Sequence, residues 1–194
     1  MGAVERQTQN NINQIEKRHV ARYEIAKKYC ENKEVLDVAC GCGYGSNILS
    51  QVAKSVRGGD YSTEAIEYAN KHWSKDNISF TQLNIKNKPI LGQYDVFVSL
   101  ETLEHIDHKL EDTINFYKSN LKEGGTLIVS HPNDETNLNL NPFHVHFNIT
   151  EEFMRGLLQE CGFNVIEVIT QEGYPGFYNY LIYVAELKKT ISNV

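Results

Sequence analysis

Two kinds of hydrophobic pattern alternate along the chain between residues 34 and 187. Short apolar or alternating runs predict seven strands, at residues 34–40, 55–60, 77–84, 94–100, 125–132, 163–171 and 177–187. Between them, apolar residues recur at helical spacing over residues 44–54, 62–73, 108–125 and 149–162. Strands that alternate with helices indicate an α/β protein with a mostly parallel sheet and helices on both faces.

The two ends of the chain refine this picture. The last two strands are joined by only about five residues, and a parallel crossover needs a dozen or more, so this pair is expected to be antiparallel. Residues 9–30 predict a polar helix with an aromatic and basic end, which we place in an N-terminal lid over residues 1–30. The length of 194 residues argues for one domain over residues 1–194.

Capping residues predict where several helices begin and end. A Ser-Thr pair opens the helix at 62–73, and Thr150 is placed to cap the helix at 149–162. The pair Gly124 and Gly125 is expected to close the helix at 108–125.

The charge balance narrows the class of partner. The chain has 19 Lys plus Arg against 25 Asp plus Glu, a formal charge of −6. This balance argues against nucleic-acid binding and against attachment to an anionic membrane, because both need clustered basic residues. No apolar run is long enough to span a bilayer, and the N-terminus lacks the apolar core of a secretory signal. We therefore expect a cytoplasmic protein, with an oligomeric state that the sequence does not indicate.

Three glycines at every second position dominate the stretch "VLDVACGCGYGSNIL", residues 35–49. They lie where the first strand passes into the first helix, the turn at which open α/β sheets bind ligands. Glycines there let the chain turn tightly and let a ligand lie against bare main chain. Asp60 ends the second strand, 15 residues after Gly45. An acid at that place suits hydrogen bonds to both hydroxyls of a ribose.

Two nucleotide ligands compete for this turn. A dinucleotide site requires the pattern G-x-G-x-x-G, but the third glycine position, counted from Gly41, is Ser46. Asp37 adds a carboxylate that would repel a pyrophosphate and attract an ammonium group. The residues therefore favour a nucleoside that carries an ammonium group over a nicotinamide dinucleotide.

Four blocks of sequence now carry a family resemblance. The stretches "VLDVACGCGYGSNIL", "GGDYSTEAIEYA", "YDVFVSLETLEHI" and "LKEGGTLIVSHPN" occur in an order and spacing that resembles class I S-adenosylmethionine-dependent methyltransferases, over residues 34–187. The resemblance implies a Rossmann-like core of seven strands whose last strand is antiparallel, with S-adenosyl-L-methionine as the cofactor. The stretch "HVARY" also resembles a subgroup associated with glycan and natural-product pathways.

The resemblance implies roles for individual residues. Asp60 matches the ribose-binding acid, and Asn84 stands where many relatives have an aspartate facing the adenine amino group. His19 and Arg22 could close over the cofactor carboxylate, although a solvated helix charge is the alternative for Arg22. The full set of implied cofactor-binding residues is Arg22, Asp37, Ala39, Gly41, Gly43, Asp60, Tyr61, Asn84, Ile85, Leu100 and Glu101.

Histidines supply the candidates for chemistry on the methyl acceptor. His105 follows the fourth strand, and His144 and His146 lie in an insertion at 131–148 that we expect on the acceptor side. Each could remove a proton from an acceptor hydroxyl, and each also has a structural alternative, either orienting a loop or packing within one. The cysteines lack the spacing of zinc ligands, and no suitably spaced carboxylate supports a metal site from His131, His144 and His146. No metal is therefore expected.

The function that we expect is direct methyl transfer to a small molecule or glycan, with an oxygen of the acceptor as the favoured methylated atom. One alternative is N-methylation of an amine or a protein side chain. Another is a non-catalytic protein that binds S-adenosylmethionine. Methylation of nucleic-acid bases is disfavoured, because the fourth strand ends in "SLETLEH" and not in an N-P-P-Y type sequence.

Overall fold

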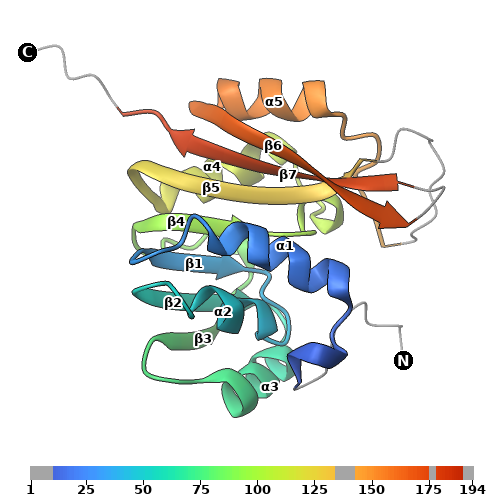
Figure 1. The fold of residues 1–194 in the computed structure, drawn as a ribbon. Coiled ribbons are helices and arrows are strands. Elements are labelled where there is room, and N and C mark those ends of the chain that lie inside the picture. The colour runs from blue at the N-terminus through green and yellow to red at the C-terminus, as the bar shows by residue number, and fades with distance from the viewer. Residues whose placement is uncertain (1–10, 134–142, 175–177, 190–194) are drawn as a thin grey trace, which may run out of the picture. The chain divides into compact units, whose positions relative to one another are not determined.

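The computed structural model describes residues 11–133, 143–174 and 178–189. The chain divides into two compact units, Met1–Asn84 and Ile85–Val194. Figure 1 shows the strands and helices of both units along the chain.

The first unit contains three parallel strands in the order β3-β2-β1. Its elements are η1 (Ile12–Gln14), α1 (Lys17–Lys27), β1 (Glu34–Val38), α2 (Tyr44–Leu49), β2 (Ser55–Asp60), α3 (Thr63–Trp73) and β3 (Ile78–Gln82). Helix α1 packs on α2, and α3 packs on β2 and β3.

The second unit contains four strands in the order β4-β5-β7-β6. Its elements are η2 (Ile85–Asn87), β4 (Tyr94–Ser99), η3 (Leu103–His105), α4 (Leu110–Ser119), β5 (Leu121–Asn133), α5 (Glu151–Glu160), β6 (Phe163–Tyr174) and β7 (Tyr178–Leu187). Strands β4 and β5 are parallel, whereas β7 runs antiparallel to both β5 and β6. The predicted antiparallel pair at the C-terminal end is therefore confirmed.

Two of the predicted helix starts are confirmed at atomic detail. The Ser62 hydroxyl accepts a hydrogen bond from the Ala65 amide, and the Thr150 hydroxyl accepts one from the Phe153 amide. Each hydroxyl satisfies an amide that has no partner within its own helix. These caps fix the starts of α3 and α5.

The predicted end of the helix at 108–125 was wrong. Helix α4 ends at Ser119, and the glycine pair lies inside β5. Asn120 explains the early end, because its fully buried side chain donates to the Phe116 carbonyl and accepts from the Leu91 amide. Helix α2 is also shorter than predicted, since it ends at Leu49.

The apolar core of the second unit includes α5, which packs on β6. Met154 and Leu158 of this helix are fully buried, while Phe153 on the same helix is 52% exposed. Burial of one such aliphatic side chain contributes about 1.5–3 kcal/mol. Among the described residues, no helix combines the length and apolar character needed to cross a bilayer.

Truncation of a buried and an exposed side chain on α5 tests this packing. Leu158→Ala should lower the free energy of unfolding by about 2–5 kcal/mol, because it leaves a cavity against β6. Phe153→Ala on the same helix should change it by no more than about 0.5 kcal/mol. Urea denaturation followed by circular dichroism measures both values, and equal effects would contradict the assigned orientation of α5.

Candidate functional site

The turn between β1 and α2 has a left-handed backbone at three positions. The φ angles of Ala39, Gly41 and Gly43 are 58°, 55° and 86°. A Cβ added at Gly43 would lie 2.7 Å from the Cβ of Ala69 and 2.8 Å from the ring of Phe80, so only glycine fits there. A Cβ added at Gly41 would meet nothing within 4 Å. The main chain at Gly41 therefore borders open space, as a turn that receives a ligand requires.

Asp60, at the end of β2, holds this turn in place. Its Oδ2 accepts a hydrogen bond from the Gly41 amide at 3.0 Å, and its Oδ1 accepts one from the Ser62 amide at 2.9 Å. The residue is 4% exposed. A carboxylate can accept about four hydrogen bonds, so these two are compatible with the predicted contact to ribose hydroxyls.

A second buried carboxylate, Asp37 of β1, joins three elements. Its Oδ2 accepts from the Ser46 hydroxyl of α2 at 2.6 Å, and its Oδ1 accepts from the Tyr23 hydroxyl of α1 at 3.2 Å. Both of its oxygens thus bond to protein hydroxyls, so Asp37 links β1 to α1 and α2. Ser46 replaces the third glycine of the dinucleotide pattern, and its hydroxyl is one of the two donors.

Burial raises the pKa of Asp37 to about 7. The hydroxyls of Ser46 and Tyr23 oppose this shift, because they stabilise the ionised form, while the nearby Asp60 carboxylate adds to it. Sequence reasoning singled out Asp37 and missed Tyr23. The ring of Tyr23 packs so closely on Gly45 that a Cβ there would lie 2.0 Å from it. The third glycine of the stretch therefore serves helix packing.

Helix α1 of the first unit carries two predicted cofactor-side residues, His19 and Arg22. Arg22 is 2% exposed, so the alternative of a solvated helix charge is wrong. Burial and, to a smaller extent, the nearby charge of Arg22 lower the pKa of His19 to about 4. At neutral pH His19 is uncharged, which leaves Arg22 as the cation of this pair.

The remaining predicted residues of the first unit lie at the ends of strands. Tyr61 follows β2 and is 66% exposed, and Asn84, which follows β3, is also exposed. The Gln82 side chain donates to the Tyr61 carbonyl at 3.1 Å and to the Thr63 hydroxyl at 2.9 Å. These bonds hold the backbone of Tyr61 beside the start of α3.

In the second unit, Ile85 begins η2, and Leu100 and Glu101 follow β4. Glu101 has a left-handed backbone, with φ of 52°. Its amide donates to the Ser130 hydroxyl at 3.0 Å, and that hydroxyl donates to Glu101 Oε1 at 2.6 Å. A residue with a Cβ is strained in this conformation, so the Ser130 bonds stabilise a backbone that the sequence alone did not predict.

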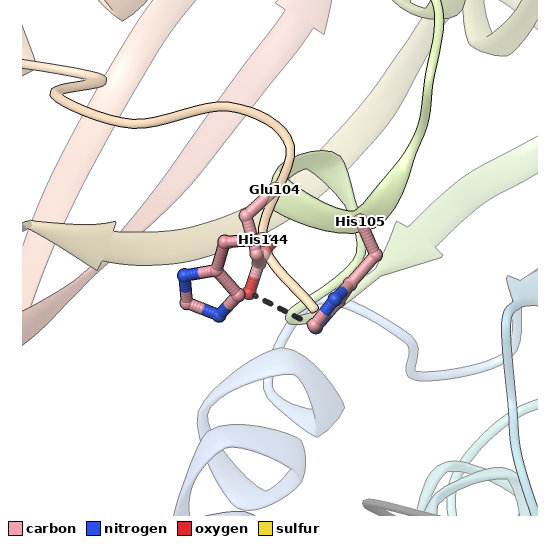
Figure 2. A group of neighbouring side chains, drawn as sticks. All are labelled: Glu104, His105 and His144. Carbon is pink, nitrogen blue, oxygen red and sulfur yellow. Dashed lines mark ion pairs between the residues drawn. The ribbon is translucent and has the colours of Figure 1, made fainter. Parts of the chain in front are cut away.

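Two of the three predicted acceptor-side histidines contact each other. The rings of His105 and His144 lie 5.0 Å apart in an edge-to-face arrangement. His105 Nε2 lies 3.9 Å from Oε1 of Glu104, a buried carboxylate. Figure 2 shows the three side chains gathered at one place, with the 3.9 Å approach of Glu104 and His105 dashed.

His146, the third candidate, contacts main chain. Its Nε2 lies 2.9 Å from the Ile106 carbonyl and 2.8 Å from the His108 carbonyl. Carbonyl oxygens only accept, so Nε2 donates to them and the ring fastens its segment to the residues after η3. These contacts favour the structural alternative for His146.

The predicted insertion at 131–148 is described only in part, since 134–142 lie outside the described residues. Residues 131–133 belong to β5, and His131 is fully buried beside the Tyr183 hydroxyl. Burial lowers the pKa of His131 to about 4, so the ring is neutral at physiological pH.

The Asp37 carboxyl gives a testable pH dependence. Its pKa in the folded protein, about 7, lies above the ordinary value of 3.8. Its contribution to stability is therefore fully present below about pH 4 and is lost as the pH rises through 7. Between pH 5 and pH 8 the thermal midpoint of the unaltered protein should fall relative to that of Asp37→Asn, which cannot ionise. Parallel curves for the two proteins would contradict a raised pKa.

Comparisons with known proteins identify the family of the chain. A family model described as "Methyltransferase domain" matches residues 30–174. A protein of Mycolicibacterium smegmatis named "Probable S-adenosylmethionine-dependent methyltransferase" is 28% identical over 160 residues, which are 79% of this chain and 60% of that protein. The mitochondrial ubiquinone biosynthesis O-methyltransferase of Saccharomyces cerevisiae is 33% identical over 101 residues, 50% of this chain and 32% of that protein. The chain thus spans less than two thirds of the length of each of these relatives.

Solved structures share the fold. The N-methyltransferase NodS from Bradyrhizobium japonicum WM9, solved with S-adenosyl-L-homocysteine, has a TM-score of 0.73 and 19% identity, over 89% of this chain and 87% of that one. This likeness confirms the predicted Rossmann-like fold class of seven strands. The family model spans most of the chain, in the same stretch that carries the glycine turn and both buried aspartates. The chain belongs to the methyltransferase domain family, within the class I S-adenosylmethionine-dependent methyltransferases.

Proposed function

We propose that this chain binds S-adenosyl-L-methionine at the β1–α2 turn and transfers its methyl group to an acceptor by direct in-line displacement. The observation that carries the proposal is the left-handed turn at Ala39, Gly41 and Gly43, braced by Asp60 and bordering open space at Gly41. The named relatives and the structure solved with S-adenosyl-L-homocysteine support this cofactor.

Each end of the cofactor has candidate partners in the chain. Asp60 would accept hydrogen bonds from the ribose hydroxyls, beside the exposed Tyr61 and Asn84 for the adenine. The buried guanidinium of Arg22 suits the cofactor carboxylate, because a planar guanidinium can bind a carboxylate with two parallel hydrogen bonds. Ile85, Leu100 and Glu101 remain proposed contacts to the cofactor.

Methyl transfer from a sulfonium requires mainly that the protein align the reacting atoms. The acceptor atom, the methyl carbon and the sulfonium sulfur must lie on one line, and such positioning can supply about 7–11 kcal/mol. A hydroxyl acceptor also loses its proton, and the candidates for a base are His105, His144 and His146. The carbonyl contacts of His146 make it the least suited of the three.

We place the acceptor among small molecules or glycans, with oxygen as the methylated atom. The yeast relative is named as an O-methyltransferase, and the charge of −6 argues against nucleic acid. N-methylation is the second candidate, since NodS is an N-methyltransferase of the same fold. The cytoplasmic location stays a prediction.

The cofactor assignment predicts a selective loss of affinity. Asp60→Ala removes one or two charge-assisted hydrogen bonds to the ribose, which should weaken S-adenosylhomocysteine binding by about 2–4 kcal/mol, or roughly 30- to 700-fold. Isothermal titration calorimetry measures the change. Asp76→Asn, at an exposed position of the same unit, is the control and should bind as the unaltered protein does. Unchanged affinity in a folded Asp60→Ala protein would contradict the ribose assignment.

Turnover is tested with S-adenosylmethionine labelled in its methyl group. We expect the purified chain, mixed with size-fractionated host extract, to transfer label to a base-stable small-molecule or glycan fraction, and Asp60→Ala to transfer much less. Label in protein would favour the N-methylation alternative. Cofactor binding without label in any fraction would favour a non-catalytic binding protein.

A further inference from the structure

We propose that Glu104, His105 and His144 form a binding site for one divalent transition-metal ion, with Zn²⁺ the ion that fits best. The site lies entirely in the second unit and does not depend on the proposed cofactor site. It departs from the expectation of no metal, which rested on ligand spacing in the sequence.

The first argument is convergence. One ligand atom from each of the three residues lies within 4.8 Å of the other two. Zn²⁺ binds imidazole nitrogen at about 2.0–2.1 Å and carboxylate oxygen at about 2.0–2.2 Å, so tetrahedral ligands lie roughly 3.3–3.5 Å apart. A movement of little more than an ångström would bring the three ligand atoms to that spacing. Figure 2 shows the carboxylate between the two rings.

The second argument is the tautomer of His105. Its Nδ1 lies 3.1 Å from the Phe143 carbonyl, which can only accept, so Nδ1 carries the hydrogen. In the neutral ring the lone pair is then on Nε2, the atom that faces Glu104 Oε1 at 3.9 Å. A metal-binding histidine usually donates its other N–H to a carbonyl or a carboxylate in the same way.

The distance between Nε2 and the carboxylate separates two interpretations. A proton shared between them would bring the atoms to about 2.7–2.9 Å, the usual length of a charge-assisted hydrogen bond. At 3.9 Å the gap is too long for that bond and suits a shared cation. The Glu104 side chain is only 2% exposed, and a buried carboxylate is costly unless positive charge lies close by.

The third argument is that main chain fixes His144 in place. The amides of Val145 and His146 donate to the Glu104 carbonyl at 2.7 Å and 3.2 Å. On the other side of His144, the Phe143 carbonyl accepts from His105. These bonds hold the segment at 143–146 against η3 and place the His144 ring 5.0 Å from that of His105. The ligands are therefore positioned before any ion binds, which lowers the entropic cost of binding.

The donor set selects the kind of ion. Two imidazoles and one carboxylate suit Zn²⁺ and neighbouring first-row ions, whereas Mg²⁺ and Ca²⁺ prefer ligand sets made of oxygen alone. Three protein ligands would leave one position of a tetrahedral ion for water or another small ligand.

The test uses the full chain, stripped with a chelator and titrated with ZnCl₂ by calorimetry. We expect one ion per chain with a Kd in the micromolar range or tighter. Glu104→Gln and His144→Ala should each weaken binding at least about tenfold. His72→Ala is the control, since His72 lies on α3 in the first unit and contacts Tyr68.

Cobalt provides a second measurement that needs no variant. The Co²⁺ complex of the unaltered chain should show ligand-field absorption without thiolate-to-metal charge transfer, because the proposed ligands contain no sulfur. Charge-transfer absorption would assign the ion to one of the cysteines and overturn the proposal. Absence of stoichiometric Zn²⁺ binding, or full binding by folded Glu104→Gln and His144→Ala proteins, would overturn it as well.

Discussion

The hydrogen bond from the Gly41 amide to the Asp60 carboxylate is the contact on which the proposed cofactor site depends. It joins the turn after β1 to the end of β2 and fixes the orientation of the Gly41 peptide in that turn. The same carboxylate accepts from the Ser62 amide and so also fixes the entry to α3. A single buried side chain therefore sets the geometry of two neighbouring strand ends, which is where parallel sheets bind their ligands.

Asp37 of β1 stabilises the helices beside this turn. It is fully buried, and its two oxygens accept hydrogen bonds from the hydroxyls of Tyr23 and Ser46, which lie on separate helices. The cost of burying its charge raises its pKa to about 7. The proposed site thus combines one carboxylate that faces the turn with a second that secures the helices around it.

The sequence predicted most of this first unit, because its signals are local. Alternating glycines and an acid at the end of the next strand occupy fixed places along the chain, and both were found where the pattern put them. Tyr23 could not be predicted in the same way, since its contact with Asp37 depends on how α1 packs. The wrong end of α4 has a similar cause: the buried side chain of Asn120 ends the helix before the glycines that signalled its end.

In the second unit the sequence singled out His105 and His144 but could not show which side chains lie beside them. His105 and His144 were candidates for removing a proton, yet their neighbour Glu104 lies 40 residues from His144 along the chain. The Val145 and His146 amides donate to the Glu104 carbonyl, and the His105 ring donates to the Phe143 carbonyl, so these bonds bring the three residues together. His146 was equally prominent in the sequence, but its ring donates to the Ile106 and His108 carbonyls, which favours an anchoring role over chemistry.

A crystal structure of the chain with S-adenosylhomocysteine would test the central claim most directly. The account predicts that the ribose hydroxyls lie within hydrogen-bond distance of Asp60 and that the ligand passes over the main chain of Gly41. A ligand bound elsewhere, or a ribose that does not contact Asp60, would contradict it.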